Sequence, residues 1–133
     1  MNAERSADAP PYSTARVRAV RLPSSVTEDD LVAVEEPLEI RIGGVPVAVT
    51  MRTPGHDFEL AAGFLLTEGL LGSAAEIEAI RYCTDVERAD QELNVLTVHL
   101  RRPFDAASLQ RNFFATSSCG VCGKASIDQL EVA

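Results

Sequence analysis

The stretch Leu31–Gly72, LVAVEEPLEIRIGGVPVAVTMRTPGHDFELAAGFLLTEGLLG, holds the patterns that decide the fold. In its first part, apolar residues alternate with other residues on both sides of Gly43-Gly44: Leu38, Ile40, Ile42, Val45, Val47 and Val49. A period of two is a strand signal, and paired glycines between two such runs are typical of a tight turn. Residues 31–52 are therefore predicted to contain a β-hairpin.

The second part, residues 53–72, changes to a helical period. Apolar residues at positions i, i+3, i+4, i+7 and i+8 predict one buried helix face: Phe58, Ala61, Ala62, Leu65 and Leu66. Thr53 is the predicted N-cap, with Pro54 at the first helical position. We expect Gly69 or Gly72 to end this helix.

The flanking segments complete the predicted domain. The patterns predict strands at 16–22, 76–83 and 92–100, a connection at 24–30, and a short helix at 105–113. This order of elements predicts an α+β or mixed α/β fold. Residues 1–14 have the composition of a flexible tail, which leaves residues 15–133 as the single domain.

Charge and composition exclude several classes of function. The net charge is −8, and residues 23–133 alone carry eight basic and eighteen acidic side chains. Such an acidic body repels phosphate backbones, so nucleic acid is not expected as a partner. No apolar run approaches the ~20 residues that span a bilayer. Three cysteines without a secretory signal favour a reducing compartment, and we expect the cytoplasm.

The candidate reactive site is a C-x-x-C pair in FFATSSCGVCGKASIDQLEVA, residues 113–133. A structural zinc site needs about four ligands. The available ligands are Cys83, Cys119, Cys122, His56 and His99, so zinc requires the fold to bring distant residues together. A thioredoxin-like dithiol would directly follow a strand, whereas this pair follows a polar turn.

A zinc deaminase signature requires H-x-E followed by P-C-x-x-C. Here His56 and Glu59 form H-x-x-E, and Ser118 stands where the proline would be. We therefore expect His56 to be a first-turn helix residue and Glu59 to be solvated.

A nucleophilic thiolate fits the neighbours of the pair. Glycine follows each cysteine and leaves backbone amides near sulfur, while Ser117, Ser118 and Lys124 add hydrogen-bond donors and a positive charge. The alternative is a buried, inert pair. The third cysteine, Cys83, ends a predicted strand and is expected to be a buried packing residue.

The last residues raise a separate expectation. Ser126-x-x-Gln129 is a capping-box pattern that opens a helix, but few residues follow it. A helix this short is marginal unless it docks. We expect the sequence to be cut inside a longer protein, with a short docked helix as the alternative.

Three motifs together resemble the FdhD (NarQ) family of formate dehydrogenase accessory proteins: TSSCGVCGKASID, RTPGHDFELAAGFLLTEGLL and EEPLEIRIGGVPVAVTMRTPG. The resemblance runs from about Val17 to the end. It implies a cytidine deaminase-like sandwich with an N-terminal β-hairpin region. Family members are roughly twice as long, and their later half is implicated in binding the guanine dinucleotide ends of a cofactor. We therefore expect the domain to be truncated here.

The resemblance also implies a function as a sulfur carrier, or sulfurtransferase. A cysteine desulfurase of the IscS type would load sulfur onto Cys119 as a persulfide, with Cys122 assisting. The sulfur would pass to the molybdenum bis-pterin guanine dinucleotide cofactor, a transient substrate that formate dehydrogenase needs. No permanent cofactor or metal is expected, and a homodimer is possible. The alternatives are a zinc-binding module and a non-catalytic accessory protein.

Overall fold

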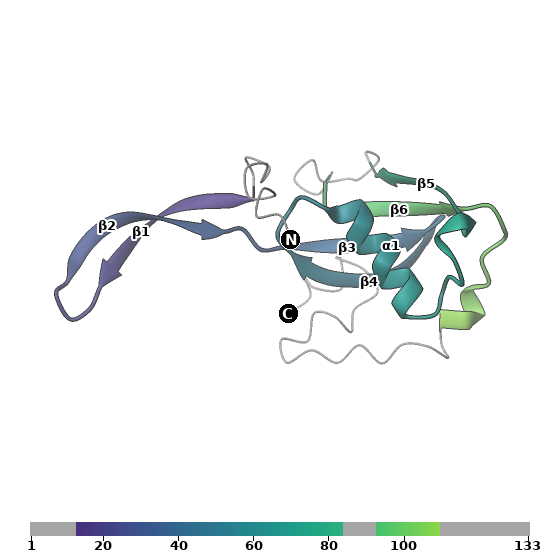
Figure 1. Ribbon diagram of the computed structural model, residues 1–133, viewed down its shortest axis with the longest axis horizontal. Coiled ribbons are helices and arrows are strands. Elements are labelled where there is room, and N and C mark those ends of the chain that lie inside the picture. Colours follow the sequence, from purple (N-terminus) through teal and green to yellow (C-terminus); the bar gives the residue numbers. More distant parts are fainter. Residues whose placement is uncertain (1–12, 84–92, 110–133) are drawn as a thin grey trace, which may run out of the picture. The chain divides into compact units, whose positions relative to one another are not determined.

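The computed structural model describes residues 13–83 and 93–109 (Figure 1). The elements in order are β1 (Thr14–Arg21), β2 (Val26–Ala33), β3 (Glu36–Ile42), β4 (Val45–Arg52), α1 (Asp57–Thr67), η2 (Ala74–Glu76), β5 (Ile77–Tyr82), β6 (Val95–Leu100) and η4 (Ala106–Ser108). The chain divides into two compact units. Of the described residues, one unit contains 13–36 and 52–55, and the other contains 37–51, 56–83 and 93–109.

The first unit is built on an antiparallel ribbon of β1 and β2. The register runs from Thr14 opposite Ala33 to Arg21 opposite Val26. Cross-strand ion pairs support it, among them Arg21 Nη2 to Asp30 Oδ2 at 3.4 Å. The strand predicted at 16–22 is confirmed. The connection predicted at 24–30 is wrong. Most of this segment belongs to β2 and pairs residue by residue with β1, although its run of charged residues lacks the alternation that predicts a strand.

The second unit contains a four-stranded sheet in the order β4-β3-β6-β5. Strand β3 pairs in parallel with β6, and β5 pairs antiparallel with β6. Gly43 has a φ of 58° in the turn between β3 and β4, and its N–H donates to the Val98 carbonyl at 3.0 Å. The hairpin and the strands predicted at 76–83 and 92–100 are confirmed, with shorter bounds.

Helix α1 begins later than predicted. The N-cap residue is His56, whose side chain makes no capping hydrogen bond. The predicted N-cap, Thr53, is wrong because Gly55 has a φ of 157°, far from the helical value of about −63°. The backbone therefore cannot run helically from Pro54 into α1.

Gly69, one of the two residues predicted to end α1, directly follows the C-cap residue Glu68. It has a φ of 72°, and its N–H donates to the Leu66 carbonyl at 3.2 Å. The N–H of Leu70 donates to the Leu65 carbonyl at 3.0 Å. These two bonds form a Schellman motif, which satisfies carbonyls at the end of the helix and turns the chain back toward the sheet.

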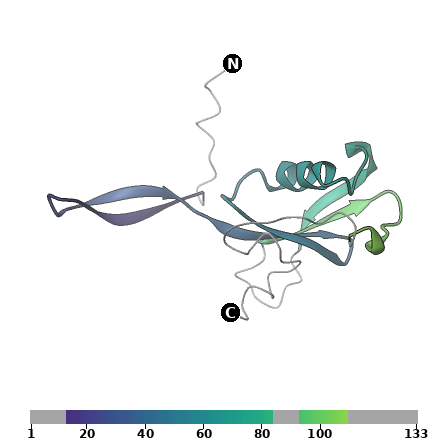
Figure 2. The same ribbon diagram turned by 90° about the horizontal axis from the view of Figure 1, so that it is seen from below.

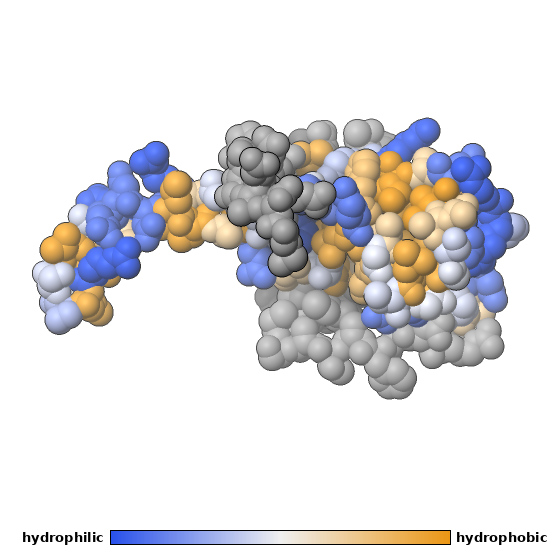
Figure 3. Space-filling view, viewed as in Figure 1, coloured by the Kyte–Doolittle hydropathy of each residue, from blue (hydrophilic) through white to orange (hydrophobic). Residues whose placement is uncertain are grey.

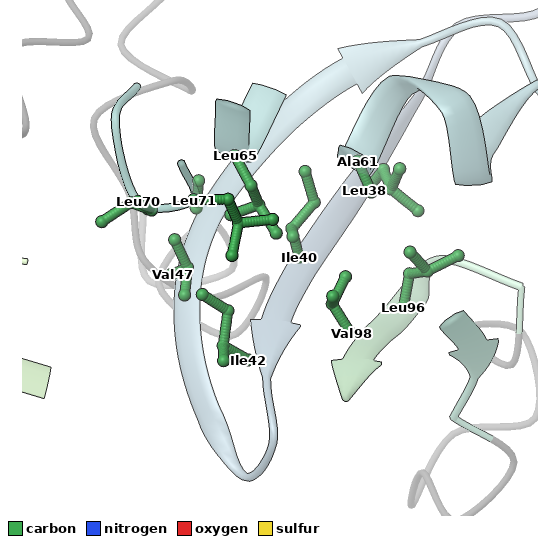
Figure 4. Packing of buried hydrophobic residues seen from close by; sticks show 11 residues of the cluster. Leu38, Ile40, Ile42, Val47, Ala61, Leu65, Leu70, Leu71, Leu96 and Val98 are labelled. Carbon is green, nitrogen blue, oxygen red and sulfur yellow. The ribbon is translucent and has the colours of Figure 1, made fainter. Parts of the chain in front are cut away.

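The core lies between α1 and one face of the sheet (Figures 2 and 4). Its members are Leu38, Ile40, Ile42, Val47, Ala48, Ala61, Leu65, Leu70, Leu71, Leu96 and Val98. Ala61 and Leu65 confirm the centre of the predicted helix face. Phe58 does not belong to it, because its side chain is 41% exposed. Apolar residues lie at the surface over α1 in Figure 3, and Leu60 on this helix is 37% exposed.

These elements make a mixed α/β fold, as predicted. The finer prediction of a cytidine deaminase-like sandwich and the division into tail and domain stay predictions. Of the short helix predicted at 105–113, the structure describes one 3-10 turn, Ala106–Ser108, which the Asp105 carboxylate caps through the Ala107 N–H at 2.9 Å. In the described parts of the chain, no helix is long and apolar enough to cross a membrane.

Candidate functional site

The predicted reactive cysteines, Cys119 and Cys122, lie outside the described residues. The predicted capping box from Ser126 to Gln129 also lies outside them. Cys83 is described: it directly follows β5, and its N–H donates to the Val95 carbonyl at 2.8 Å. Its strand-end position is confirmed, but its side chain is only half-buried and thus more accessible than predicted.

The residues of the deaminase-like comparison lie at the start of α1. His56 Nδ1 is 3.9 Å from Glu59 Oε1, and the two side chains are 88% and 75% exposed. Glu59 is therefore solvated, as the sequence predicts. His56 is solvated too, but it is the N-cap residue of α1 and not the first-turn helix residue that was predicted. Within residues 13–83 and 93–109, no group of three or more His, Cys, Asp or Glu side chains is placed to hold a metal ion.

A buried carboxylate that the sequence analysis missed lies in the same turn. Asp57 is 2% exposed, and its Oδ2 accepts a hydrogen bond from the Tyr82 hydroxyl at 2.9 Å. The Tyr82 ring also packs against Phe58, with 5.3 Å between ring centroids. This arrangement ties the start of α1 to the end of β5. A signal was present: Asp57 stands four residues before Ala61, on the helix face that the fold buries.

A second missed feature joins α1 to β5. Ser73 and Glu76 form a capping box around η2: Ser73 Oγ accepts from the Ala75 N–H at 3.2 Å, and Glu76 Oε1 accepts from the Ser73 N–H at 3.1 Å. Arg102 donates to the other oxygen of Glu76. The hydrogen bond from Arg102, followed by that from the Gly72 N–H, lowers the pKa of Glu76. The Ser-x-x-Glu spacing would have predicted this box.

Comparison with known proteins places these residues in a family. The model described as the FdhD/NarQ family matches residues 33–133. The chain belongs to the FdhD/NarQ family. The matched range contains Asp57 and Tyr82 of the described body, and it contains Cys119 and Cys122.

Curated relatives in this family are named as sulfur carriers. The chain is 50% identical over 121 residues to "Sulfur carrier protein FdhD" of Mycolicibacterium paratuberculosis, covering 89% of this chain and 44% of that protein. It is 47% identical over 120 residues to the protein of the same name from Nocardia farcinica, covering 88% and 42%. This FdhD/NarQ chain thus spans less than half the length of the curated relatives it matches.

A solved structure resembles the fold. It is a crystal structure of a protein described as a formate dehydrogenase accessory protein, from Desulfotalea psychrophila. The TM-score is 0.50 at 25% identity, and the match covers 65% of this chain and 33% of that one. The family and the mixed α/β fold are thereby established together. The described residues, 13–83 and 93–109, precede the cysteine pair in the sequence.

Proposed function

We propose that this chain carries sulfur as a persulfide on Cys119 and delivers it for the maturation of formate dehydrogenase. The observation that carries the proposal is the family match over residues 33–133, because it runs through both cysteines of the C-G-x-C-G motif. Relatives that share this range are named sulfur carrier proteins. The likeness to a formate dehydrogenase accessory protein supports the choice of enzyme served.

The loading step is a thiolate exchange. The Cys119 thiolate attacks the terminal sulfur of a persulfide on a cysteine desulfurase of the IscS type. A new sulfur–sulfur bond forms on Cys119 as the donor bond breaks, and the desulfurase cysteine leaves as a thiolate. No external oxidant or reductant is consumed. Ser118 and the backbone amides beside Gly120 are the groups that the sequence offers to stabilise the anionic sulfur.

Cys122 completes the proposed cycle as a resolving thiol. Its thiolate attacks the inner sulfur of the Cys119 persulfide and forms a disulfide between the two cysteines. The terminal sulfur leaves as hydrosulfide with the electron pair of the broken bond, and a dithiol reductant restores the thiols. The substrate that receives this sulfur is the molybdenum bis-pterin guanine dinucleotide cofactor, whose soft metal suits a sulfur ligand. A cytoplasmic homodimer is part of the same proposal.

Intact-mass analysis tests the carrier function directly. The complete chain is incubated with an IscS-type desulfurase and cysteine, and we expect a gain of one sulfur atom. Cys119→Ala should abolish this gain. Cys83→Ala is the matched control, because Cys83 lies at the end of β5 and has no part in the proposed exchange. A desulfurase whose active-site cysteine is replaced should load nothing.

Three outcomes would contradict the proposal. If the wild-type chain gains no sulfur but purifies with stoichiometric zinc, it is a zinc-binding module. If it binds the molybdenum cofactor without ever carrying sulfur, it is a non-catalytic accessory protein. Loss of loading in Cys83→Ala, with loading intact in Cys119→Ala, would move the carrier role to Cys83.

A further inference from the structure

Polar side chains form a row across the face of the sheet that points away from α1. The strand register pairs Arg41 of β3 with Thr97 of β6, and Thr97 with Arg81 of β5. Residues paired directly across strands point to the same face. Their sequence neighbours Ile40 and Leu96 belong to the core beneath α1, so this row lies on the opposite face.

An open depression lies beside this row. It has a volume of about 420 Å³ and is lined by Glu78, Ala79, Arg81 and His99. Ala79 pairs with His99 two residues along from the Arg81 and Thr97 pair, so these side chains share the face of the row. A volume of this order holds a small molecule or ionic group with its water.

A β-bulge adds Glu78 to the lining. The register shifts between Ile77 and Ala79, so that Ile77 pairs with Leu100 and Ala79 pairs with His99. Glu78 is the extra residue and has no partner in this ladder. Bulges redirect side chains, and the effect here is that two consecutive residues of β5 line one depression.

The two arginines of the row differ in their ion pairing. Arg41 donates through Nε to Oε1 of Glu39 at 2.6 Å, and the Glu39 side chain is 2% exposed. Within the described ranges, by contrast, Arg81 and His99 make no ion pair and no side-chain hydrogen bond, and both are exposed. The guanidinium of Arg81 and a ring N–H of His99 are therefore available as donors at the depression.

We propose that this depression binds a small tetrahedral oxyanion, of the phosphate or sulfate class. Arg81 presents the planar fork of N–H groups that grips two oxygens of such an anion. His99 supplies a further donor from β6, and the half-buried Thr97 hydroxyl lies in the adjacent row. Glu78 opposes binding through its negative charge. None of these side chains takes part in the proposed sulfur transfer.

The test measures binding of inorganic phosphate to the complete chain by isothermal titration, at constant pH and with ionic strength held constant by chloride. We expect saturable binding by the wild-type chain. Arg81→Gln should weaken it about tenfold or more, as the loss of charge-assisted hydrogen bonds predicts. Glu78→Gln should tighten it several-fold, because it removes the repelling carboxylate. Arg18→Gln, an exposed arginine of β1, is the matched control and should leave binding unchanged.

Separate titrations with sulfate and with a phosphate monoester distinguish a free inorganic anion from the phosphate group of a larger ligand. Saturable binding of any of the three that depends on Arg81 supports the site. The proposal fails if chloride competes as well as phosphate, or if Arg81→Gln and Arg18→Gln behave alike. It also fails if Glu78→Gln weakens binding. His99→Gln is a second variant that should weaken binding, should Arg81→Gln not yield folded protein.

Discussion

The Tyr82 hydroxyl donates a hydrogen bond to the Asp57 carboxylate, with 2.9 Å between Oη and Oδ2. The bond joins the last residue of β5 to the first residue of α1, which are 25 positions apart in the sequence. Because Asp57 is 2% exposed, its polar atoms need hydrogen-bond partners within the protein. The positive end of the α1 dipole also favours a carboxylate at this position.

Removing this hydrogen bond should destabilise the fold. We expect Tyr82→Phe, which keeps the ring contact with Phe58, to lower the free energy of unfolding by about 1–3 kcal/mol. Urea denaturation followed by circular dichroism measures the change. A double-mutant cycle with Asp57→Ala isolates the coupling between the two side chains. If the two losses simply add, the hydrogen bond does not stabilise the fold.

Two glycines of the α1 region should respond to alanine with opposite signs. Gly69→Ala forces a Cβ onto a residue with a φ of 72°, and should cost about 1–2 kcal/mol. Gly63 lies within the helix, and a Cβ there would meet nothing within 4 Å. Gly63→Ala should therefore stabilise the chain by about 0.5–1 kcal/mol. Chemical denaturation of both variants checks the signs, and a loss of stability in Gly63→Ala would contradict the open surface seen at that position.

The contribution of Glu76 to stability should depend on pH. Arg102 and the Gly72 N–H hold the pKa of Glu76 below its ordinary value of 4.5. The ionised carboxylate therefore stabilises the fold above pH 4.5, and this contribution is lost as the pH falls through the lowered value. We expect Glu76→Gln to be less stable than wild type at pH 7, because glutamine keeps the capping box but not the charge.

The stability difference between wild type and Glu76→Gln should shrink as the pH falls below 4.5. Denaturation curves recorded from pH 7 down to the acid limit of the fold would show it. The matched control is Glu35→Gln at an exposed position, which should show a smaller pH-dependent difference. If the stability difference between wild type and Glu76→Gln widens on acidification, the carboxylate does not stabilise the folded state.

The two cysteines of the proposed sulfur carrier should differ in how they release sulfur. After loading and removal of the desulfurase, wild-type chain should lose its added sulfur and form a disulfide, seen as the loss of two hydrogen atoms in the intact mass. Cys122→Ala should keep the persulfide for longer, because no resolving thiol attacks it. Equal persulfide lifetimes in the two proteins would leave Cys119 as a carrier that works without Cys122.

Local sequence patterns were sufficient to predict much of the described fold. The alternation of Leu38, Ile40 and Ile42 predicted β3, and the paired glycines predicted its turn into β4. The helical period predicted α1, and Gly69 was predicted as one of two places for its end. Each of these features depends on neighbours within a few residues, since side-chain period and backbone conformation are local properties. The resemblance to the FdhD family was likewise carried by short motifs, and the family match confirms it.

The tertiary structure decided what depends on distant partners. Strand β2 carries a run of acids without alternation, and it is a strand because β1 pairs with it. Helix α1 starts at Asp57, later than predicted, because the backbone of Gly55 is not helical. The Asp57 side chain is buried and accepts a hydrogen bond from Tyr82, which belongs to another element. The row of Arg41, Thr97 and Arg81 comes from the parallel pairing of β6 with β3 and its antiparallel pairing with β5. Strand order and register join residues far apart in the chain, so local periodicity could not predict them.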